Sequence, residues 1–291
     1  MTSNANAFDV RAERYADRLK ADGYVIIPNA VPTDTISVMN ADMSKRFKDT
    51  PFCVGPFYGN CTKRFGKLLT RSKVASQFVQ HELILSIVRN ILMPFADTIG
   101  LNLTQAIEIH PGAGAQVPHR DENMWGGPKG DIEYLVNVMW PLTDYRHDNG
   151  ATILWPKSHS KGAGGIDSTP IEIAAGSAFV FLGSTLHGAG GNQSQEIRRG
   201  MIISYCLGWL KPYENQWLCY PPEVAKHFSP ELADLVGYHT HRPNLGNYEG
   251  QCPSVLLGYE VPEHLGAIDC LRPDQEELIK SYLNGELKLA A

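Results

Sequence analysis

The sequence of 291 residues contains no apolar run approaching the ~20 residues that a membrane-spanning helix needs. It also contains no block of like charges, and its formal net charge is only −5, so neither nucleic acid nor a membrane surface is expected as a partner. Six cysteines occur without Cys-x-x-Cys spacing, which argues against a structural zinc site. The first residues lack the basic and apolar segments of a secretion signal. These absences favour a cytoplasmic globular protein with reduced thiols.

Helical and extended segments occupy different parts of the chain. Apolar residues recur at helical spacing in residues 8–22 and 73–99, and residues 32–35 supply capping chemistry for a helix that ends near Phe47. A short buried strand is expected at residues 24–27. From about residue 101 the pattern changes to short β-type segments separated by Gly, Pro, Asn or Asp. These segments are 103–110, 132–141, 151–155, 170–173, 177–182 and 200–210.

Strands at this spacing favour a β-sandwich or barrel over a sheet that alternates with helices. The sequence has no internal repeat and no clear linker, so we predict a single domain that spans residues 1–291. Residues 1–100 would form a helical N-terminal flank and residues 101–210 the β core. Residues 211–291, with a terminal helix at 273–284, would form a C-terminal cap that either covers a pocket or provides a homodimer surface.

A His-x-Asp pair, His119 and Asp121, lies between two Gly-rich runs. Side chains two residues apart in an extended backbone point to the same side, so both can bind one metal ion. His187, which follows the apolar segment 177–182, is the candidate for the third ligand. Two imidazoles and one carboxylate on one face of an iron ion leave positions open for a cosubstrate and O₂. Without a third ligand the pair would be an ordinary short motif that binds no metal.

Three further polar residues suit a dicarboxylate beside such a metal. Arg198, at the start of the last β-type segment, offers a permanently charged, bidentate partner for a carboxylate. Thr152 can add a hydroxyl group and Gln116 an amide. The alternative is that Arg198 and its neighbour Arg199 simply cap a strand edge, and the alternation of side chains does not choose between the two arginines.

Together these residues resemble the phytanoyl-CoA dioxygenase family of non-haem Fe(II)/2-oxoglutarate oxygenases, and in particular its members in natural-product biosynthesis. The resemblance extends over roughly residues 17–210, with matching order and spacing. It rests on residues 22–29, 119–121, 148–152, 156–159, 176–181 and 187–192, followed by Arg198.

The resemblance implies a mainly β fold with flanking helices, whose core is a double-stranded β-helix of the jelly-roll, cupin-like kind. It implies that the catalytic residues are the three ligands of Fe(II), and that O₂ and 2-oxoglutarate are consumed. It also implies that Arg198 binds the distal carboxylate of 2-oxoglutarate and that Thr152 and Gln116 contact the same cosubstrate. The implied iron ligands are His119, Asp121 and His187.

The implied enzyme is a dioxygenase that hydroxylates, desaturates or rearranges a largely apolar small molecule, a secondary metabolite such as a terpenoid or alkaloid, and releases succinate and CO₂. Phytanoyl-CoA itself is not expected, because the sequence has no basic cluster suited to the phosphates of coenzyme A. Two alternatives are kept. One is a hydroxylase of a free amino acid or other polar small molecule, and the other is a metal-binding cupin-type isomerase or binding module that does not use 2-oxoglutarate.

Overall fold

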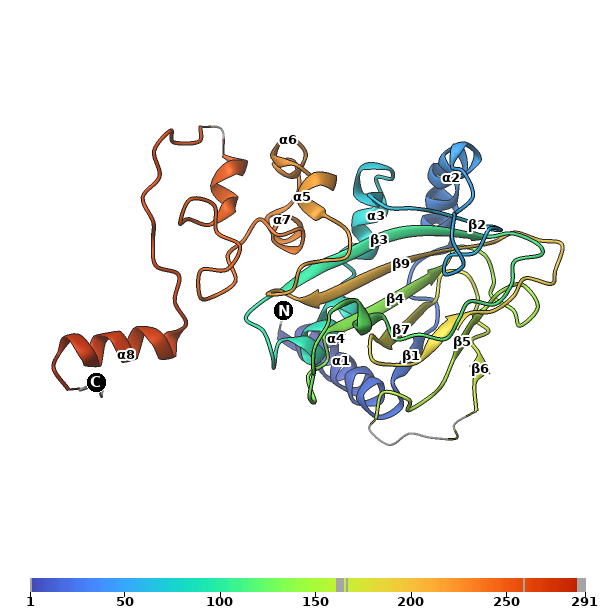
Figure 1. The fold of residues 1–291 in the computed structure, drawn as a ribbon, viewed down its shortest axis with the longest axis horizontal. Helices are drawn as coiled ribbons and strands as arrows, with labels where there is room; N and C mark the ends of the chain where they lie inside the picture. The colour runs from blue at the N-terminus through green and yellow to red at the C-terminus, as the bar shows by residue number, and fades with distance from the viewer. Residues whose placement is uncertain (1, 161–164, 166, 259, 287–291) are drawn as a thin grey trace. The chain divides into compact units, whose positions relative to one another are not determined.

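The computed structural model describes residues 2–160, 165, 167–258 and 260–286 (Figure 1). The chain divides into two compact units, Met1–Cys219 and Tyr220–Ala291. The first unit contains both β-sheets and the residues that the sequence predicts to be functional. Among the described helices, none combines the length and the apolar character that a membrane span requires.

Two antiparallel sheets make up the core of the first unit. The larger has the strand order β1-β7-β4-β9-β3-β2, and the smaller has the order β6-β5-β8. Strands that are neighbours in the sheet are mostly distant in sequence, which is the arrangement of a jelly roll rather than of a simple meander. The predicted fold class is confirmed. The strands are Tyr24–Ile27 (β1), Thr62–Phe65 (β2), Ile99–Ile109 (β3), Leu135–Pro141 (β4), Thr152–Leu154 (β5), Thr169–Pro170 (β6), Ala178–Leu182 (β7), His187–Ala189 (β8) and Arg198–Leu207 (β9).

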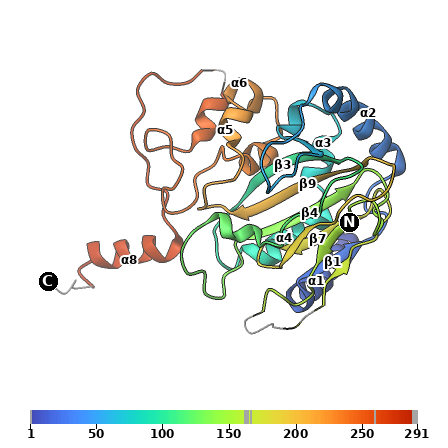
Figure 2. The same ribbon diagram turned by 45° about the vertical axis from the view of Figure 1, so that its right-hand side comes forward.

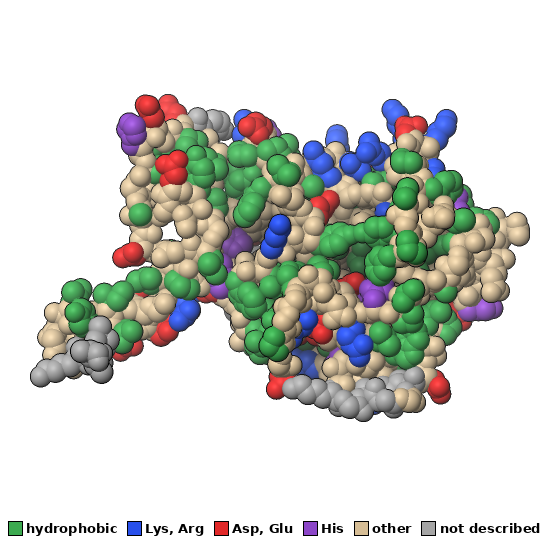
Figure 3. Space-filling view, in the orientation of Figure 1, with side chains coloured by type: hydrophobic (Ala, Val, Ile, Leu, Met, Phe, Trp, Pro, Cys, Tyr) green, Lys and Arg blue, Asp and Glu red, His purple; other side chains and the backbone are tan. Residues whose placement is uncertain are grey.

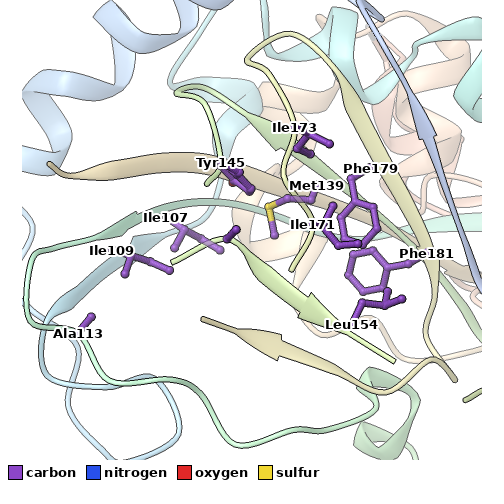
Figure 4. Packing of buried hydrophobic residues seen from close by; sticks show 11 residues of the cluster. Ile107, Ile109, Ala113, Met139, Tyr145, Leu154, Ile171, Ile173, Phe179 and Phe181 are labelled. Atoms are coloured by element: carbon purple, nitrogen blue, oxygen red, sulfur yellow. The ribbon is translucent and has the colours of Figure 1, made fainter. Parts of the chain in front are cut away.

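Apolar side chains from both sheets form the core between them (Figure 4). Phe179 and Phe181 of β7 alternate with residues on the other face of the strand, and their rings stack at 4.8 Å. They meet Met139 of β4 and Leu154 of β5, all nearly or fully buried. Burial of each such side chain contributes about 1.5–3 kcal/mol. This core fixes the register in which polar side chains further along the same strands face inward.

Four helices pack against the outer face of the larger sheet (Figures 1 and 2). Trp140 of β4 points outward and meets Phe78 at 5.1 Å between ring centroids. Phe65 of β2 likewise contacts Phe47 at 4.7 Å. The outer face is therefore closed by apolar contacts, which leaves the inner face for a site. The helices are Thr2–Asp22 (α1), Thr33–Asp49 (α2), Ala75–Val79 (α3) and Glu82–Leu92 (α4).

The structure corrects the predicted helix at 73–99. It is two helices, α3 and α4, because His81 starts a new helix by accepting a hydrogen bond from the Ile84 N–H. The second helix ends at Leu92, two residues before Pro94, and Ile99 already belongs to β3. Strands β2 and β8 were not predicted, because each is too short to show an apolar alternation.

The second unit is mainly irregular with short helices. These are Pro222–Ala225 (α6), Pro230–Leu235 (α7) and Pro273–Leu283 (α8), together with the 3₁₀ helix Pro253–Leu257 (η3). Ser229 caps α7 by accepting a hydrogen bond from the Leu232 N–H. The terminal helix predicted at residues 273–284 is present as α8. The predicted role of residues 211–291 as a cap or dimer surface stays a prediction.

A partly buried carboxyl group, that of Glu133, precedes β4. It accepts hydrogen bonds from the Ser184 hydroxyl and from the N–H groups of Ser184 and Leu135. Burial raises the pKa of Glu133 from 4.5 to about 7, although these hydrogen bonds act in the opposite direction. The folded state thus binds more protons than the unfolded state between these two values, and this part of the stability is lost as the pH rises through about 7.

A Glu133→Gln variant should remove this pH dependence, because the amide resembles the protonated acid in shape and stays neutral. As the pH rises from 5 to 8, the wild type should lose stability and the variant should not, so the variant should gain up to about 3 kcal/mol relative to the wild type across this interval. Urea unfolding at the two pH values measures the difference. If the free energy of unfolding differs between variant and wild type by the same amount at both pH values, Glu133 does not titrate in this range.

Candidate active site

His119 and His187 lie directly opposite each other on two extended segments. Each backbone N–H donates to the carbonyl oxygen of the other, at 2.9 and 3.0 Å, and the rings are 4.5 Å apart. Residues that are 68 positions apart in the sequence are therefore held side by side by the backbone itself. The separation between the two imidazoles is set before any ligand arrives.

The orientation of each imidazole is fixed by a backbone carbonyl group. Nδ1 of His119 lies 2.9 Å from the Val117 oxygen, and Nδ1 of His187 lies 3.0 Å from the Thr185 oxygen. Since a carbonyl oxygen only accepts, the proton resides on Nδ1 in both rings. Nε2 of each ring is then directed toward Asp121, and it is the nitrogen available to a metal.

Asp121 completes the group at the first position of a short 3₁₀ helix, Asp121–Met124 (η2). Its carboxylate oxygens lie 3.3 Å from Nε2 of His119 and 3.5 Å from Nε2 of His187. Burial alone would raise the pKa of Asp121, but His187 and then His119 lower it far below its ordinary value. Burial lowers the pKa of His119, but the hydrogen bond to Asp121, the charge of Asp121 and the Val117 carbonyl group together outweigh burial and raise it.

The three side chains form a donor set that fits a metal ion. One ligand atom from each lies within 4.8 Å of the others, and no other group of this kind occurs among the described residues. Two neutral imidazoles and an ionised carboxylate are the ligands that a non-haem Fe(II) site uses. The structure thus brings together the triad predicted from sequence.

The triad lines an open cavity between the sheets, with a volume of about 110 Å³. Figure 3 shows this face of the molecule, with apolar side chains around the central hollow and acidic and histidine groups within it. The three residues predicted to hold the cosubstrate, Arg198, Thr152 and Gln116, line the same cavity. The Oε1 atom of Gln116 also accepts a hydrogen bond of 3.3 Å from the Ala189 N–H.

Arg198 is buried, with 2% of its surface exposed, and its guanidinium carbon lies 3.7 Å from the ring centroid of Tyr145. None of the described residues accepts a hydrogen bond from its Nε or Nη2 atom. Burial lowers the pKa of Arg198, and Tyr145 opposes that shift. A buried guanidinium with unpaired donors is strongly stabilised by an anion, and a carboxylate matches its geometry.

The next residue, Arg199, points to the opposite face of β9. Its Nε donates to Glu108 at 2.7 Å and its Nη1 to the Ser44 hydroxyl at 3.0 Å. Of the two adjacent arginines, only Arg198 lines the cavity. The sequence left this choice to family resemblance. The physical reason is that the two side chains point to opposite faces of β9 and the cavity lies on the face of Arg198.

Arg64 is a second cation in the cavity, and sequence reasoning missed it. It lies on β2, donates to Gln105 at 3.2 Å and has a buried Nε atom without an acceptor among the described residues. Burial lowers the pKa of Arg64, and the charge of Arg198 contributes to the same shift. The four-residue alternation of β2, with Phe65 outward and Arg64 inward, is the only sequence signal that could have placed it.

Aromatic side chains surround the entrance. The ring of Phe57 lies 4.9 Å from that of His119, and the hydroxyls of Tyr58 and Tyr213 hydrogen-bond to each other. Burial and the Tyr58 hydrogen bond raise the pKa of Tyr213 to about 12. Phe57, Tyr58 and Met124 also line the cavity. Tyr213 was not predicted.

Other aromatic and histidine side chains lie outside the cavity. Phe52 packs against His110 at 4.9 Å, and Trp217 is half-exposed and does not line the cavity. Nε2 of His159 lies 2.9 Å from the Lys20 carbonyl oxygen, a contact that stabilises a loop.

The model of the phytanoyl-CoA dioxygenase (PhyH) family matches residues 19–200, which is more than half of the chain. The chain belongs to this family. The predicted family and the predicted enzyme class, a dioxygenase, are confirmed. The dioxygenase is 28% identical over 255 residues to dioxygenase cdmD of Talaromyces verruculosus, covering 76% of this chain and 82% of that protein. It is also 28% identical to the multifunctional dioxygenase ausE of Emericella nidulans, over 86% of this chain and 91% of that protein.

Solved structures share the fold of this dioxygenase. The non-haem α-ketoglutarate-dependent epimerase SnoN from nogalamycin biosynthesis matches with a TM-score of 0.58 at 17% identity, covering 68% of this chain and 83% of that chain. HygX from Streptomyces hygroscopicus, with nickel, 2-oxoglutarate and hygromycin B bound, matches with a TM-score of 0.52 at 14% identity, covering 67% and 86%. The predicted jelly-roll architecture is confirmed by both.

Proposed function

We propose that this protein is an Fe(II)- and 2-oxoglutarate-dependent dioxygenase of a largely apolar small molecule. The observation that carries the proposal is the convergence of two imidazole Nε2 atoms and one ionised carboxylate on one point of an open cavity. His119, Asp121 and His187 would hold the iron. The metal and 2-oxoglutarate, when bound, supply the oxidation, in which O₂ is consumed and succinate and CO₂ are released.

The cationic groups of the cavity support 2-oxoglutarate as the cosubstrate. This molecule carries a carboxylate at each end, and the cavity contains two buried guanidinium groups, those of Arg198 and Arg64. Their mutual repulsion would be relieved by a dianion between them. Thr152 offers a hydroxyl to the end bound by Arg198, and Gln116 lies on the backbone segment that leads to His119. Arg198 would hold the distal carboxylate, and Arg64 the end nearer the metal.

The apolar wall of the cavity supports a largely apolar substrate. Phe57 covers one side of His119, and Met139, Phe181 and Ile202 line the interior. These side chains would exclude water from the metal and orient the substrate by contact rather than by charge. Apart from the triad, the charged residues of the cavity are Arg64 and Arg198, and both are assigned to the cosubstrate. This disfavours the alternative of a free amino acid, which needs further charged partners.

The relatives support a secondary metabolite, such as a terpenoid or alkaloid, as the substrate. The fungal relatives are dioxygenases, and the SnoN enzyme comes from nogalamycin biosynthesis. We infer that the protein acts on such a molecule in the cytoplasm, without nucleic acid or membrane partners. The arrangement of residues 211–291 as a cap or as a homodimer surface is part of the same proposal.

Anaerobic titration tests the proposal. Addition of Fe(II) and 2-oxoglutarate to the full-length protein should produce a visible metal-to-ligand charge-transfer band, and admission of O₂ should release succinate. Zn(II) in place of Fe(II) is the control, because it should occupy the triad without giving the band. Metal binding with no band and no succinate would favour the cupin-type isomerase or binding module instead. Succinate release can then be used to screen candidate substrates.

A further inference from the structure

Asn137 is the one polar partner of the triad that has no assigned role. It lies in the middle of β4, is fully buried and lines the cavity. Its Nδ2 atom donates to Oδ2 of Asp121 at 3.0 Å. Among the described residues, the other polar partners of this carboxylate are His119 and His187, which are themselves metal ligands. Within the part of the chain that the structure describes, Asn137 is thus the only side chain outside the triad that hydrogen-bonds to the Asp121 carboxylate.

The burial of an amide at this position needs an explanation. The next inward-facing residue of β4, Met139, is apolar, and the Oδ1 atom of Asn137 is buried without a hydrogen-bond donor among the described residues. A buried polar atom without a partner destabilises a fold, and an apolar side chain of similar size would avoid that cost. An apolar residue could fill the same space, but it could not donate a hydrogen bond to Asp121. This bond therefore explains why an amide is buried here.

We propose that Asn137 is a positioning residue that makes Asp121 a monodentate ligand. The proposal rests on the metal site put forward above. Oδ2, which lies 3.5 Å from Nε2 of His187, accepts the bond from Nδ2 of Asn137. Oδ1 lies 3.3 Å from Nε2 of His119 and accepts no hydrogen bond from outside the triad among the described residues, so it is the oxygen left for the metal. A carboxylate free to rotate would chelate through both oxygens and occupy a position that 2-oxoglutarate needs. A neutral amide donor also leaves the full negative charge on Asp121, which a cationic donor would not.

Two variants test this role. Asn137→Leu is close in size but cannot donate, and Asn137→Gln keeps the donor on a longer side chain. We expect Asn137→Leu to raise the Kd for Co(II) or Fe(II) roughly 10- to 100-fold, the range typical of outer-shell partners. The Kd for 2-oxoglutarate, followed by the charge-transfer band at saturating Fe(II), should also rise. Asn137→Gln should recover part of both losses.

Asn40→Leu is the matched control. Asn40 lies on α2 and does not line the cavity, its Nδ2 atom donates to the Leu142 carbonyl oxygen at 2.7 Å, and its Oδ1 atom, like that of Asn137, is buried without a donor among the described residues. This variant should lower the melting temperature without changing the Kd for the metal. The metal-free melting temperatures of all variants separate loss of stability from loss of affinity.

The outcomes are distinguishable. If the wild type binds neither metal nor 2-oxoglutarate, the proposed function fails. If the wild type binds both and Asn137→Leu binds them equally well, the function stands and the positioning role is wrong. A Kd that rises equally in Asn137→Leu and Asn40→Leu would also contradict the proposal, because a general loss of stability would then be responsible.

Discussion

Replacing His187 with alanine should abolish metal binding at the triad and with it all consumption of 2-oxoglutarate. The backbone bonds between positions 187 and 119 would remain, so the strands should keep their places. Only two ligands would be left for the metal. We expect an increase in the Kd for Fe(II) well beyond the roughly 10- to 100-fold that outer-shell partners cause. Competition against a coloured chelator measures the Kd, and succinate release measures turnover.

The exposed residue His147 provides the control for this substitution. It lies in a loop, its side chain is 75% exposed, and it pairs with Glu172 rather than with the site. His147→Ala should bind metal like the wild type. Added imidazole should partly restore metal binding to the His187→Ala protein, because the cavity left by the side chain is next to the vacant coordination position. Full activity of His187→Ala without imidazole would refute the proposed metal site.

Replacing Arg198 with lysine should greatly raise the KM for 2-oxoglutarate while leaving metal binding intact. Lysine keeps the charge but cannot form the two parallel hydrogen bonds of a guanidinium with a carboxylate, and it cannot stack on Tyr145 in the same way. Loss of one hydrogen bond to a charged group costs about 1.5–3 kcal/mol. We therefore expect the KM for 2-oxoglutarate to rise roughly 10- to 100-fold, measured by succinate release.

The adjacent arginine offers a matched comparison. Arg199→Lys makes the same chemical change one residue away, where the side chain pairs with Glu108 on the outer face of the sheet. Its KM for 2-oxoglutarate should equal that of the wild type. Equal KM values for the two lysine variants and the wild type would mean that the cosubstrate carboxylate lies elsewhere, with Arg64 as the next candidate.

The part of the site that was predictable from sequence is the part carried by local motifs. His119 and Asp121 share one extended segment, and His187 follows a strand that is apolar throughout, so both could be found from short patterns. For the arginine, the local pattern led only to the pair Arg198 and Arg199, and the family resemblance chose Arg198. The spacing of short β-type segments, each bounded by turn residues, predicted only a sandwich or barrel, and the family resemblance implied the jelly-roll core.

The missed residues depend on contacts between distant segments. Arg64 enters the cavity only because β2 pairs with β3 at the edge of the larger sheet, and four residues show too little alternation to predict that pairing. Tyr213 reaches Tyr58 because Asn102 anchors the segment that carries it: the Tyr213 N–H donates to Asn102 at 2.8 Å. No local pattern in the sequence encodes such a connection.

The backbone pairing of His119 with His187 has a consequence for folding as well as for catalysis. A metal ion bound by both residues acts as a cross-link that closes a loop of 68 residues. If it behaved as a covalent cross-link of that length does, it would disfavour the unfolded chain by about 4 kcal/mol. Strands β4, β5, β6 and β7 all lie within this loop. The iron would therefore stabilise the jelly roll, and its loss would lower the stability of the enzyme as well as abolish its activity.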